Sequence, residues 1–244
     1  MQDAMFERFM AGDHEYIAWT GIQFEGMTVH VSSDAIKVLV PRDTLRQVLR
    51  DEGFEAPESL GDARIRFPVC YEQHVAACRK YDWVPPTAAL SDAIWRAAGT
   101  KIDPKGLVQR QQDARFMATM GFILKHNQGV DAALAAKGAL SGTLVAGGVG
   151  KDWILHKRLE ERGAVNYGWH RSSGSPVQPV AATHDRKHFD YSQVLRAVRR
   201  EARAADGSSV DLLEWMRKSH RDGPFPVAER FLQQLDGRSP LPIA

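Results

Sequence analysis

The sequence predicts an α+β fold: a single mixed domain in which an antiparallel sheet packs against several helices. Segments rich in β-branched residues alternate with amphipathic helical segments along the chain, which is typical of such a domain. Two strand-like segments, 164–170 and 176–184, flank a Ser/Gly-rich turn and predict an antiparallel hairpin. Hydrophobic residues make up 43% of the 244 positions, enough for a sizeable core. We therefore expect residues 1–244 to form one domain.

The N-terminal third is expected to alternate short strands with helices. The expected strands span residues 28–31, 35–40 and 63–70, and the expected helices span 3–11, 41–54 and 71–83. Pro41 is well placed to open the second helix because its fixed φ suits a first helical turn. Gly12 and Gly53 are expected to end the first two helices.

The middle of the chain predicts two longer helices. They are expected over residues 87–99 and 116–139, with a loop over 100–115 between them. Thr87 is the expected N-cap of the first. The second is expected to be interrupted near residues 127–129, which would expose His126 at a helix end.

The C-terminal segment has a strong hairpin signal. The pair Asp206-Gly207 predicts a tight turn after a strand over 194–204, followed by a helix over 210–219. Four prolines predict an irregular end to the chain, namely Pro224, Pro226, Pro240 and Pro242.

Residues 144–192 contain most of the polar groups that could perform chemistry. Asp152 is a plausible N-cap for a helix over 152–162 that Gly163 would end, with Lys151 at its entrance. A cation and free backbone N–H groups would then lie near the hairpin.

The first hairpin strand is expected to have two different faces, because side chains alternate along a strand. Val165, Tyr167 and Trp169 would share an apolar face. Asn166, Gly168 and His170 would share a small, polar one.

This density of titratable and amide groups favours a hydrolase or acyl-transfer enzyme acting on an amide or ester. We expect His170 to be the general acid/base and His184 or Asp190 to orient it. Lys151 and Gln178 would stabilise developing negative charge. Ser192 is a candidate nucleophile, although its DYSQ context is not a GxSxG elbow, and Asp190 and Ser192 are also typical turn or capping residues. The remaining candidate ligand-binding residues are Asp152, Tyr167, Trp169, Tyr191 and His126.

Two other functions remain open. In a non-catalytic binding module, Tyr167 and Trp169 would stack on a sugar or cell-wall fragment. In a thiol hydrolase, Cys70 at the start of a helix would pair with His170. A buried, structural Cys70 is the more frequent situation for this residue type, and Cys78 is expected in the core. Their spacing in one helix predicts two free thiols.

Phosphate-loop and metal-site patterns are incomplete. In GGVGK, Val145 stands at the first glycine position of the phosphate-loop pattern and Asp152 follows the lysine, so we expect a glycine-rich strand-to-helix turn instead. His170, His184, His188 and Asp190 are of types that bind metals, yet their spacing matches no zinc motif. We expect no metal and no cofactor. The basic run that includes Arg196 is most simply a solvated face.

The composition disfavours some classes of binding partner. A net charge of +2 disfavours a general nucleic-acid role. No apolar run is long enough for a membrane helix, and no secretory signal is evident, so a cytoplasmic location is the default expectation. We expect a small-molecule, peptide or glycan substrate, and the sequence does not indicate an oligomeric state.

Several short segments resemble a widespread group of uncharacterised bacterial proteins. The similar segments are Lys151-Asp152, NYGWH at 166–170, PVQP at 176–179, His184 and DYS at 190–192. The regions VSSDAIKV and PPT…DAIW also look like that group, so the similarity spans most of the chain. Members tend to have His-Gly after the serine, whereas Gln193 and Val194 follow here. The resemblance implies no particular activity, and no role for that histidine carries over.

Overall fold

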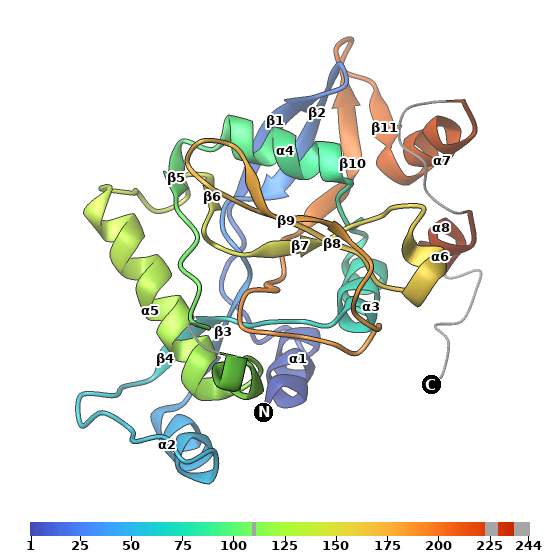
Figure 1. Cartoon of the computed structure of the whole chain (residues 1–244). Coiled ribbons are helices and arrows are strands. Elements are labelled where there is room, and N and C mark those ends of the chain that lie inside the picture. Colours follow the sequence, from blue (N-terminus) through green and yellow to red (C-terminus); the bar gives the residue numbers. More distant parts are fainter. Residues whose placement is uncertain (109–110, 223–228, 237–244) are drawn as a thin grey trace.

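A computed structural model describes residues 1–108, 111–222 and 229–236 (Figure 1). It confirms the mixed α+β fold. The helices are α1 (Gln2–Met10), α2 (Arg42–Asp51), α3 (Tyr71–Tyr81), α4 (Ala88–Ala97), α5 (Met120–Ala136), α6 (Leu159–Arg162), α7 (Leu212–Asp222) and α8 (Glu229–Leu235), with a 3₁₀ helix η1 (Gln111–Phe116). The strands are β1 (Trp19–Phe24), β2 (Met27–Ser32), β3 (Lys37–Val40), β4 (Ala63–Arg66), β5 (Thr100–Ile102), β6 (Val145–Gly147), β7 (Lys151–Trp153), β8 (Asn166–His170), β9 (Pro176–Ala181), β10 (Val198–Ala204) and β11 (Ser209–Asp211).

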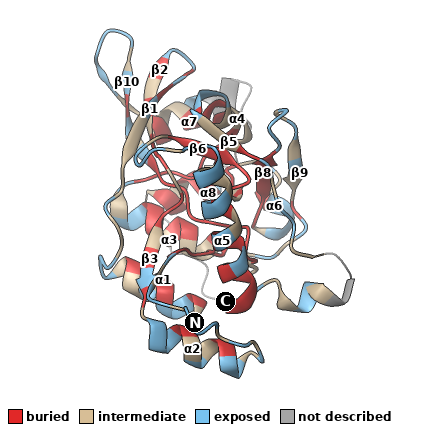
Figure 2. Cartoon of the chain, turned by 90° about the vertical axis from the view of Figure 1, so that its left-hand side faces the viewer, coloured by how far each residue is buried: buried red, intermediate tan, exposed pale blue. Residues whose placement is uncertain are grey.

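The described strands form four small sheets. The largest has the order β1-β2-β10-β11, so a C-terminal strand pairs with an N-terminal hairpin. β3 pairs with β4, β7-β8-β9 form a third sheet, and β5 pairs with β6. Among these described pairs only β5–β6 is parallel. In Figure 2 the buried segments gather in the middle of the molecule, around β8, whereas the turn between β1 and β2 is exposed.

The β1–β2 hairpin contains a strand that the sequence analysis did not predict. Glu25 and Gly26 connect the strands with φ of 49° and 76°. Positive φ at both central residues belongs to the turn type that best matches the twist of paired strands. The sequence signal for this turn is the pair Glu25-Gly26, in which glycine follows a polar residue that is not β-branched.

The sheet β7-β8-β9 contains the predicted hairpin. β8 and β9 pair antiparallel across residues 171–175, as expected. β7 pairs antiparallel with β8 on its other edge, with Lys151 opposite Gly168 and Asp152 opposite Tyr167. α4 packs on β8 and lies above this sheet in Figure 1, beginning at its predicted cap, where the Thr87 side chain accepts from the Leu90 N–H.

The predicted helix over 152–162 is wrong. Lys151–Trp153 is strand β7, and only α6 is helical, although Gly163 ends it in the predicted left-handed conformation. Trp153, Ile154 and Leu155 are all fully or almost fully buried. A surface helix would turn part of such a continuous apolar run toward water, whereas an extended segment inside the molecule buries all of it. Asp152 is therefore not an N-cap.

The predicted interruption of the central helix is also wrong. α5 runs unbroken through residues 127–129, so His126 lies in mid-helix and is buried rather than at a helix end. The Asn127 amide accepts from the Arg66 N–H and donates to the carbonyls of Arg66 and Ile123. These bonds satisfy a side chain that otherwise competes with helical backbone. The expected loop over 100–115 contains β5 and η1.

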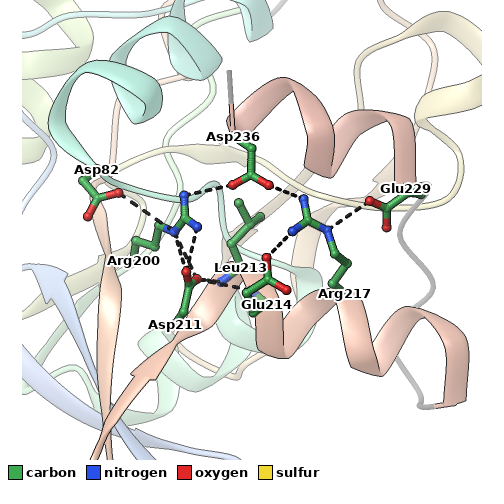
Figure 3. Close-up of polar contacts among 8 residues, drawn as sticks. All are labelled: Asp82, Arg200, Asp211, Leu213, Glu214, Arg217, Glu229 and Asp236. Atoms are coloured by element: carbon green, nitrogen blue, oxygen red, sulfur yellow. Dashed lines mark hydrogen bonds and ion pairs between the residues drawn. The ribbon is translucent and has the colours of Figure 1, made fainter. Parts of the chain in front are cut away.

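The predicted C-terminal strand, turn and helix are confirmed, because β10 and β11 pair antiparallel across the turn that contains Asp206 and Gly207, and α7 follows, then α8. An ion network joins these elements (Figure 3). Asp236 accepts from Arg200 at 3.0 Å and from Arg217 at 2.5 Å, and only 5% of its side chain is exposed. The four prolines named above lie outside the described residues. Within the described part of the chain, no helix is both long and apolar enough to cross a membrane.

Candidate functional site

A kink in β8 determines how the predicted site is arranged. Gly168 and Trp169 have φ of 103° and 55°, and the β8–β9 register shifts between Asn166 and Gly168. The positive φ of Trp169 is unusual for a bulky residue, and its indole N–H is held by the Gly148 carbonyl at 3.1 Å. Because of the kink, the expected alternation of Tyr167 and His170 onto opposite faces is wrong.

Tyr167 and His170 meet at one carboxylate. The Tyr167 hydroxyl and His170 Nε2 each lie 2.8 Å from Oδ1 of Asp92, which comes from α4. The His170 ring also stacks on Trp95, with centroids 6.0 Å apart and planes 28° apart. Since a carboxylate accepts, the neutral imidazole carries its proton on Nε2 and leaves Nδ1 as an acceptor. No described residue hydrogen-bonds to Nδ1.

His170 lines a cavity of about 20 Å³. Asp152, Arg196 and the backbone of Gly147 and Gly150 form much of the remaining lining. A cavity of this size has room for about one water molecule. We refer to His170, Asp92, Tyr167, Asp152 and Arg196 as the His170 site.

Asp152 supplies a second carboxyl group to this site. Its Oδ2 accepts from the Ser91 hydroxyl at 2.7 Å. Burial raises the pKa of Asp152, and the charge of Arg196 opposes this only in part. The site therefore combines a carboxylate at Asp92 with a carboxyl group whose protonated form is favoured by burial.

Arg196 is buried, with 5% exposure, so the expectation that it belongs to a solvated basic face is wrong. Its Nη1 and Nη2 donate to the carbonyls of Ser32 and Val145, both at 2.9 Å. These neutral acceptors fix the guanidinium without cancelling its charge. The cavity thus has a permanent positive charge on one side.

Lys151 lies on the other face of β7 and belongs to a separate cluster. Its Nζ donates to Oδ2 of Asp190 at 2.8 Å, and the Ser192 hydroxyl and N–H donate to Oδ1 at 2.5 and 2.8 Å. Burial opposes ionisation of Asp190, but the bonds and charges of His188, Lys151 and Ser192 hold its pKa well below the usual range. Asp190 and Ser192 thus have the geometry of a capped turn.

Two stacked histidines border this Lys151 cluster. The rings of His184 and His188 are 3.7 Å apart and nearly parallel, at 4°. His188 Nε2 lies 3.8 Å from Oδ2 of Asp190. Burial, reinforced by the charges of His188 and Lys151, lowers the pKa of His184 to about 4. The expectation that His184 or Asp190 orients His170 is therefore wrong, because Asp92 occupies that position.

The predicted stabilisers of negative charge do not converge on His170 either. Lys151 is paired with Asp190, and the Gln178 amide donates to the neighbouring Pro179 carbonyl at 3.1 Å. Asn166 lies on the Lys151 face of the sheet, and its buried amide has no hydrogen-bond partner among the described residues.

A third group of side chains lies beside the glycine-rich turn and consists of Trp169, Tyr191 and His126. Trp169 contacts both of the other rings, with centroids 6.3 and 6.4 Å away. Tyr167 and Trp169 are each only 9% exposed. They therefore do not form the exposed aromatic strip that a stacking module requires.

The glycine-rich turn joins two strands, so the expected strand-to-helix turn is wrong. A Cβ on Gly147 or Gly148 would lie 2.3 Å from the carbonyl oxygen of Ile102 or Asp103. Glycine at these positions lets two backbone segments of this protein approach each other.

Cys70 occupies the predicted position at the start of α3. It is 7% exposed, and burial raises its pKa. Cys78 is buried, and burial also raises its pKa. Both are free thiols, as expected. These surroundings disfavour the thiolate that a thiol hydrolase requires.

Sequence reasoning missed Asp92, Ser91 and Trp95, all in α4. The available signal was Asp92 three residues before Trp95, which places a carboxylate beside an aromatic ring on one helix face. In the described part of the chain, no group of three or more His, Cys, Asp or Glu side chains is arranged to hold a metal ion.

No family model, curated protein or solved structure matches the chain.

Proposed function

We propose that the protein is a hydrolase or acyl-transfer enzyme that acts on an amide or ester, with His170 as general base. The observation that carries this proposal is the arrangement of the His170 ring. Asp92 binds one ring nitrogen, and the ring lines a cavity that can hold a water molecule.

In the proposed reaction, Nδ1 of His170 takes a proton from a water molecule as the water oxygen attacks the carbonyl carbon. Asp92 holds the ring in the required tautomer and stabilises the imidazolium that forms, and Tyr167 helps to fix Asp92. The proton then passes from His170 to the leaving amine or alcohol as the carbon–nitrogen or carbon–oxygen bond breaks. An alcohol or amine in place of water would give acyl transfer.

Arg196 and Asp152 line the same cavity, which must widen to admit the carbonyl group of a substrate, and they would then stabilise the oxyanion. The guanidinium is fixed before the reaction by two backbone carbonyls, so it requires little reorganisation when negative charge develops. Burial favours the protonated form of Asp152, and in that form its carboxyl group would donate a hydrogen bond to the same oxygen. In this arrangement, the two carboxyl groups of the site have different tasks because their surroundings differ.

The test is turnover of a panel of p-nitrophenyl esters and aminoacyl p-nitroanilides. We expect His170→Gln to reduce kcat/KM by about 100-fold or more and Asp92→Asn to reduce it less, because general-base catalysis typically contributes 10²–10⁴-fold. His30→Gln, a partly exposed histidine on β2, is the matched control and should retain activity. Lack of turnover across the panel, or full activity of His170→Gln, would overturn the proposal. Glycan binding that survives in His170→Ala, without turnover by the parent protein, would favour a binding module.

A further inference from the structure

A second, larger cavity lies beside α5 and borders the glycine-rich turn. Its volume is about 320 Å³, which is within the range of small-molecule sites. Ile102, Leu107, Val130 and Ala133 supply apolar walls. Gly148 lines this cavity, whereas the preceding Gly147 lines the smaller one.

His126 belongs to the lining of this cavity and has a ring nitrogen that can accept a hydrogen bond. The side chain lines the cavity and is 3% exposed, and its Nε2 lies 2.9 Å from the Val149 carbonyl. Since a carbonyl can only accept, Nε2 carries the proton and Nδ1 is an acceptor. Burial lowers the pKa of His126 to about 4, so the ring is neutral at pH 7. None of the described residues hydrogen-bonds to Nδ1.

Two lysines give the cavity a positive rim. Lys105 and Lys125 line it and are exposed. The other charged group in the lining, Asp103, has both carboxylate oxygens engaged by the Ser172 N–H and hydroxyl, at 2.7 and 3.0 Å. Among the described residues no carboxylate pairs with either ammonium group, and the Lys125 ammonium lies 5.8 Å from the centroids of the Phe54 and Phe122 rings. The lining has a net charge of +1 when His126 is neutral.

The walls are fixed by buried aromatic residues. The Tyr191 hydroxyl accepts from the Leu107 N–H at 2.9 Å, and the Trp169 indole donates to the Gly148 carbonyl. Tyr191 and Trp169, two of the candidate ligand-binding residues, thus bond to the backbone of the cavity lining. A preformed site loses less conformational entropy when a ligand binds.

We propose that this cavity binds a small amphipathic acid, in which an apolar body separates an anionic group from a hydroxyl or N–H donor. The apolar body contacts the aliphatic walls, the donor bonds to Nδ1 of His126, and the anionic group pairs with Lys105 and Lys125. This site is independent of the His170 site and of the hydrolase proposal.

Calorimetric titration with three matched probes tests the proposed chemistry. 4-Hydroxybenzoate has all three features, benzoate lacks the donor, and 4-hydroxybenzamide lacks the negative charge. We expect 4-hydroxybenzoate to bind at least about 10-fold more tightly than either of the others. 6-Hydroxyhexanoate, tested beside hexanoate, provides the same comparison with a flexible body. Absence of binding by both hydroxy acids, or equal affinity for acids with and without the hydroxyl, would overturn the proposal.

A blocking variant locates the site. Gly129 lines the cavity, and a Cβ there would meet no atom within 4 Å, so Gly129→Leu should fill the cavity without disturbing α5. Replacing glycine in a helix interior also favours the helix. We expect this variant to lose binding of the hydroxy acids, whereas Ala135→Leu, at an exposed position of the same helix, should retain it. Undiminished binding in Gly129→Leu would show that the acids bind elsewhere. Ester or amide turnover should be unchanged in Gly129→Leu, which separates this result from the test of the His170 site.

Two further variants assign the polar contacts. His126→Leu should remove the preference for 4-hydroxybenzoate over benzoate, while leaving benzoate affinity within about twofold. Lys125→Gln should weaken both benzoates and leave 4-hydroxybenzamide unchanged. A retained hydroxyl preference in a folded His126→Leu protein would contradict the role of Nδ1.

Discussion

Lys151 and Asp152 are adjacent in the chain but belong to different clusters, because neighbouring residues of a strand point to opposite faces. Lys151 bonds to Asp190, and Asp152 accepts from Ser91. Because the stretch is extended, Lys151 and Asp152, which were predicted to share one site, belong to separate clusters. The alternation of a strand was sufficient to predict this division once β7 was known.

The Lys151–Asp190 pair provides the first prediction. Lys151→Met should destabilise the protein by about 3–5 kcal/mol, since it leaves the almost fully buried Asp190 carboxylate without its ammonium partner. Urea unfolding followed by circular dichroism measures this change. Adding Asp190→Asn to Lys151→Met should recover part of the loss because it removes the unpaired charge. Equal stability of the parent and Lys151→Met would contradict a buried, functioning ion pair.

The thiols provide a second prediction at this scale. Cys70 and Cys78 should both resist iodoacetamide at pH 6 in the native protein, because burial raises both pKa values and limits access. Mass spectrometry after brief labelling distinguishes the two sites, and the unfolded protein at pH 8.5 is the positive control. Selective labelling of Cys70 that is lost in His170→Ala would instead support a thiol hydrolase.

At the scale of elements, the predicted hairpin is confirmed but the kink within it was not predictable from its residue types. Glycine adopts a positive φ readily, so the conformation of Gly168 gives no specific signal in the sequence. The positive φ of Trp169 depends on tertiary contacts, such as the hydrogen bond of its indole to the Gly148 carbonyl. Because of that kink, His170 and Tyr167 both hydrogen-bond to Asp92. Similarly, Asn127 predicted a break in α5, and its bonds to Arg66 reversed that expectation.

The C-terminal helices provide an element-scale prediction. α8 has seven residues, too few to be stable alone, and Asp236 ties its end to Arg200 and Arg217. Asp236→Asn should therefore increase amide hydrogen exchange in α8 by about 10-fold or more while β2 is unaffected. Glu229→Gln, which removes a more exposed partner of Arg217, is the matched control and should have a smaller effect. Unchanged exchange in Asp236→Asn would show that apolar packing alone holds α8.

At the scale of the whole molecule, the α+β class was predictable because it follows from the order of strand and helix signals. The division of the described strands into four small sheets was not predictable, because pairing partners such as β2 and β10 are far apart in sequence. Nor was the burial of polar groups. His74, His126 and Arg196 are all at most 5% exposed, although their residue types are usually found at the surface or partly buried.

Two buried histidines and one half-buried histidine give the whole molecule a predictable pH dependence. Burial lowers the pKa of His74, His126 and His184 to about 4 each, from 6.5. The unfolded chain therefore binds more protons than the native state between pH 6.5 and 4. The native state is favoured fully above pH 6.5, and its stability should fall as the pH decreases through this window.

Replacing His74 tests the contribution of one histidine to this pH dependence of stability. Its ring is 1% exposed, and neither nitrogen has a hydrogen-bond partner among the described residues. His74→Leu removes a titrating group and two unsatisfied polar atoms, so it should be at least as stable as the parent at pH 8. At pH 5 its advantage over the parent should be larger by roughly 2 kcal/mol, because the parent alone must keep this ring neutral against its unfolded pKa. Urea unfolding at pH 8, 6 and 5 measures both differences. His30→Leu, at a partly exposed position on β2, is the control for replacing a histidine with leucine. Parallel stability curves for the parent and His74→Leu would show that His74 does not titrate differently in the two states.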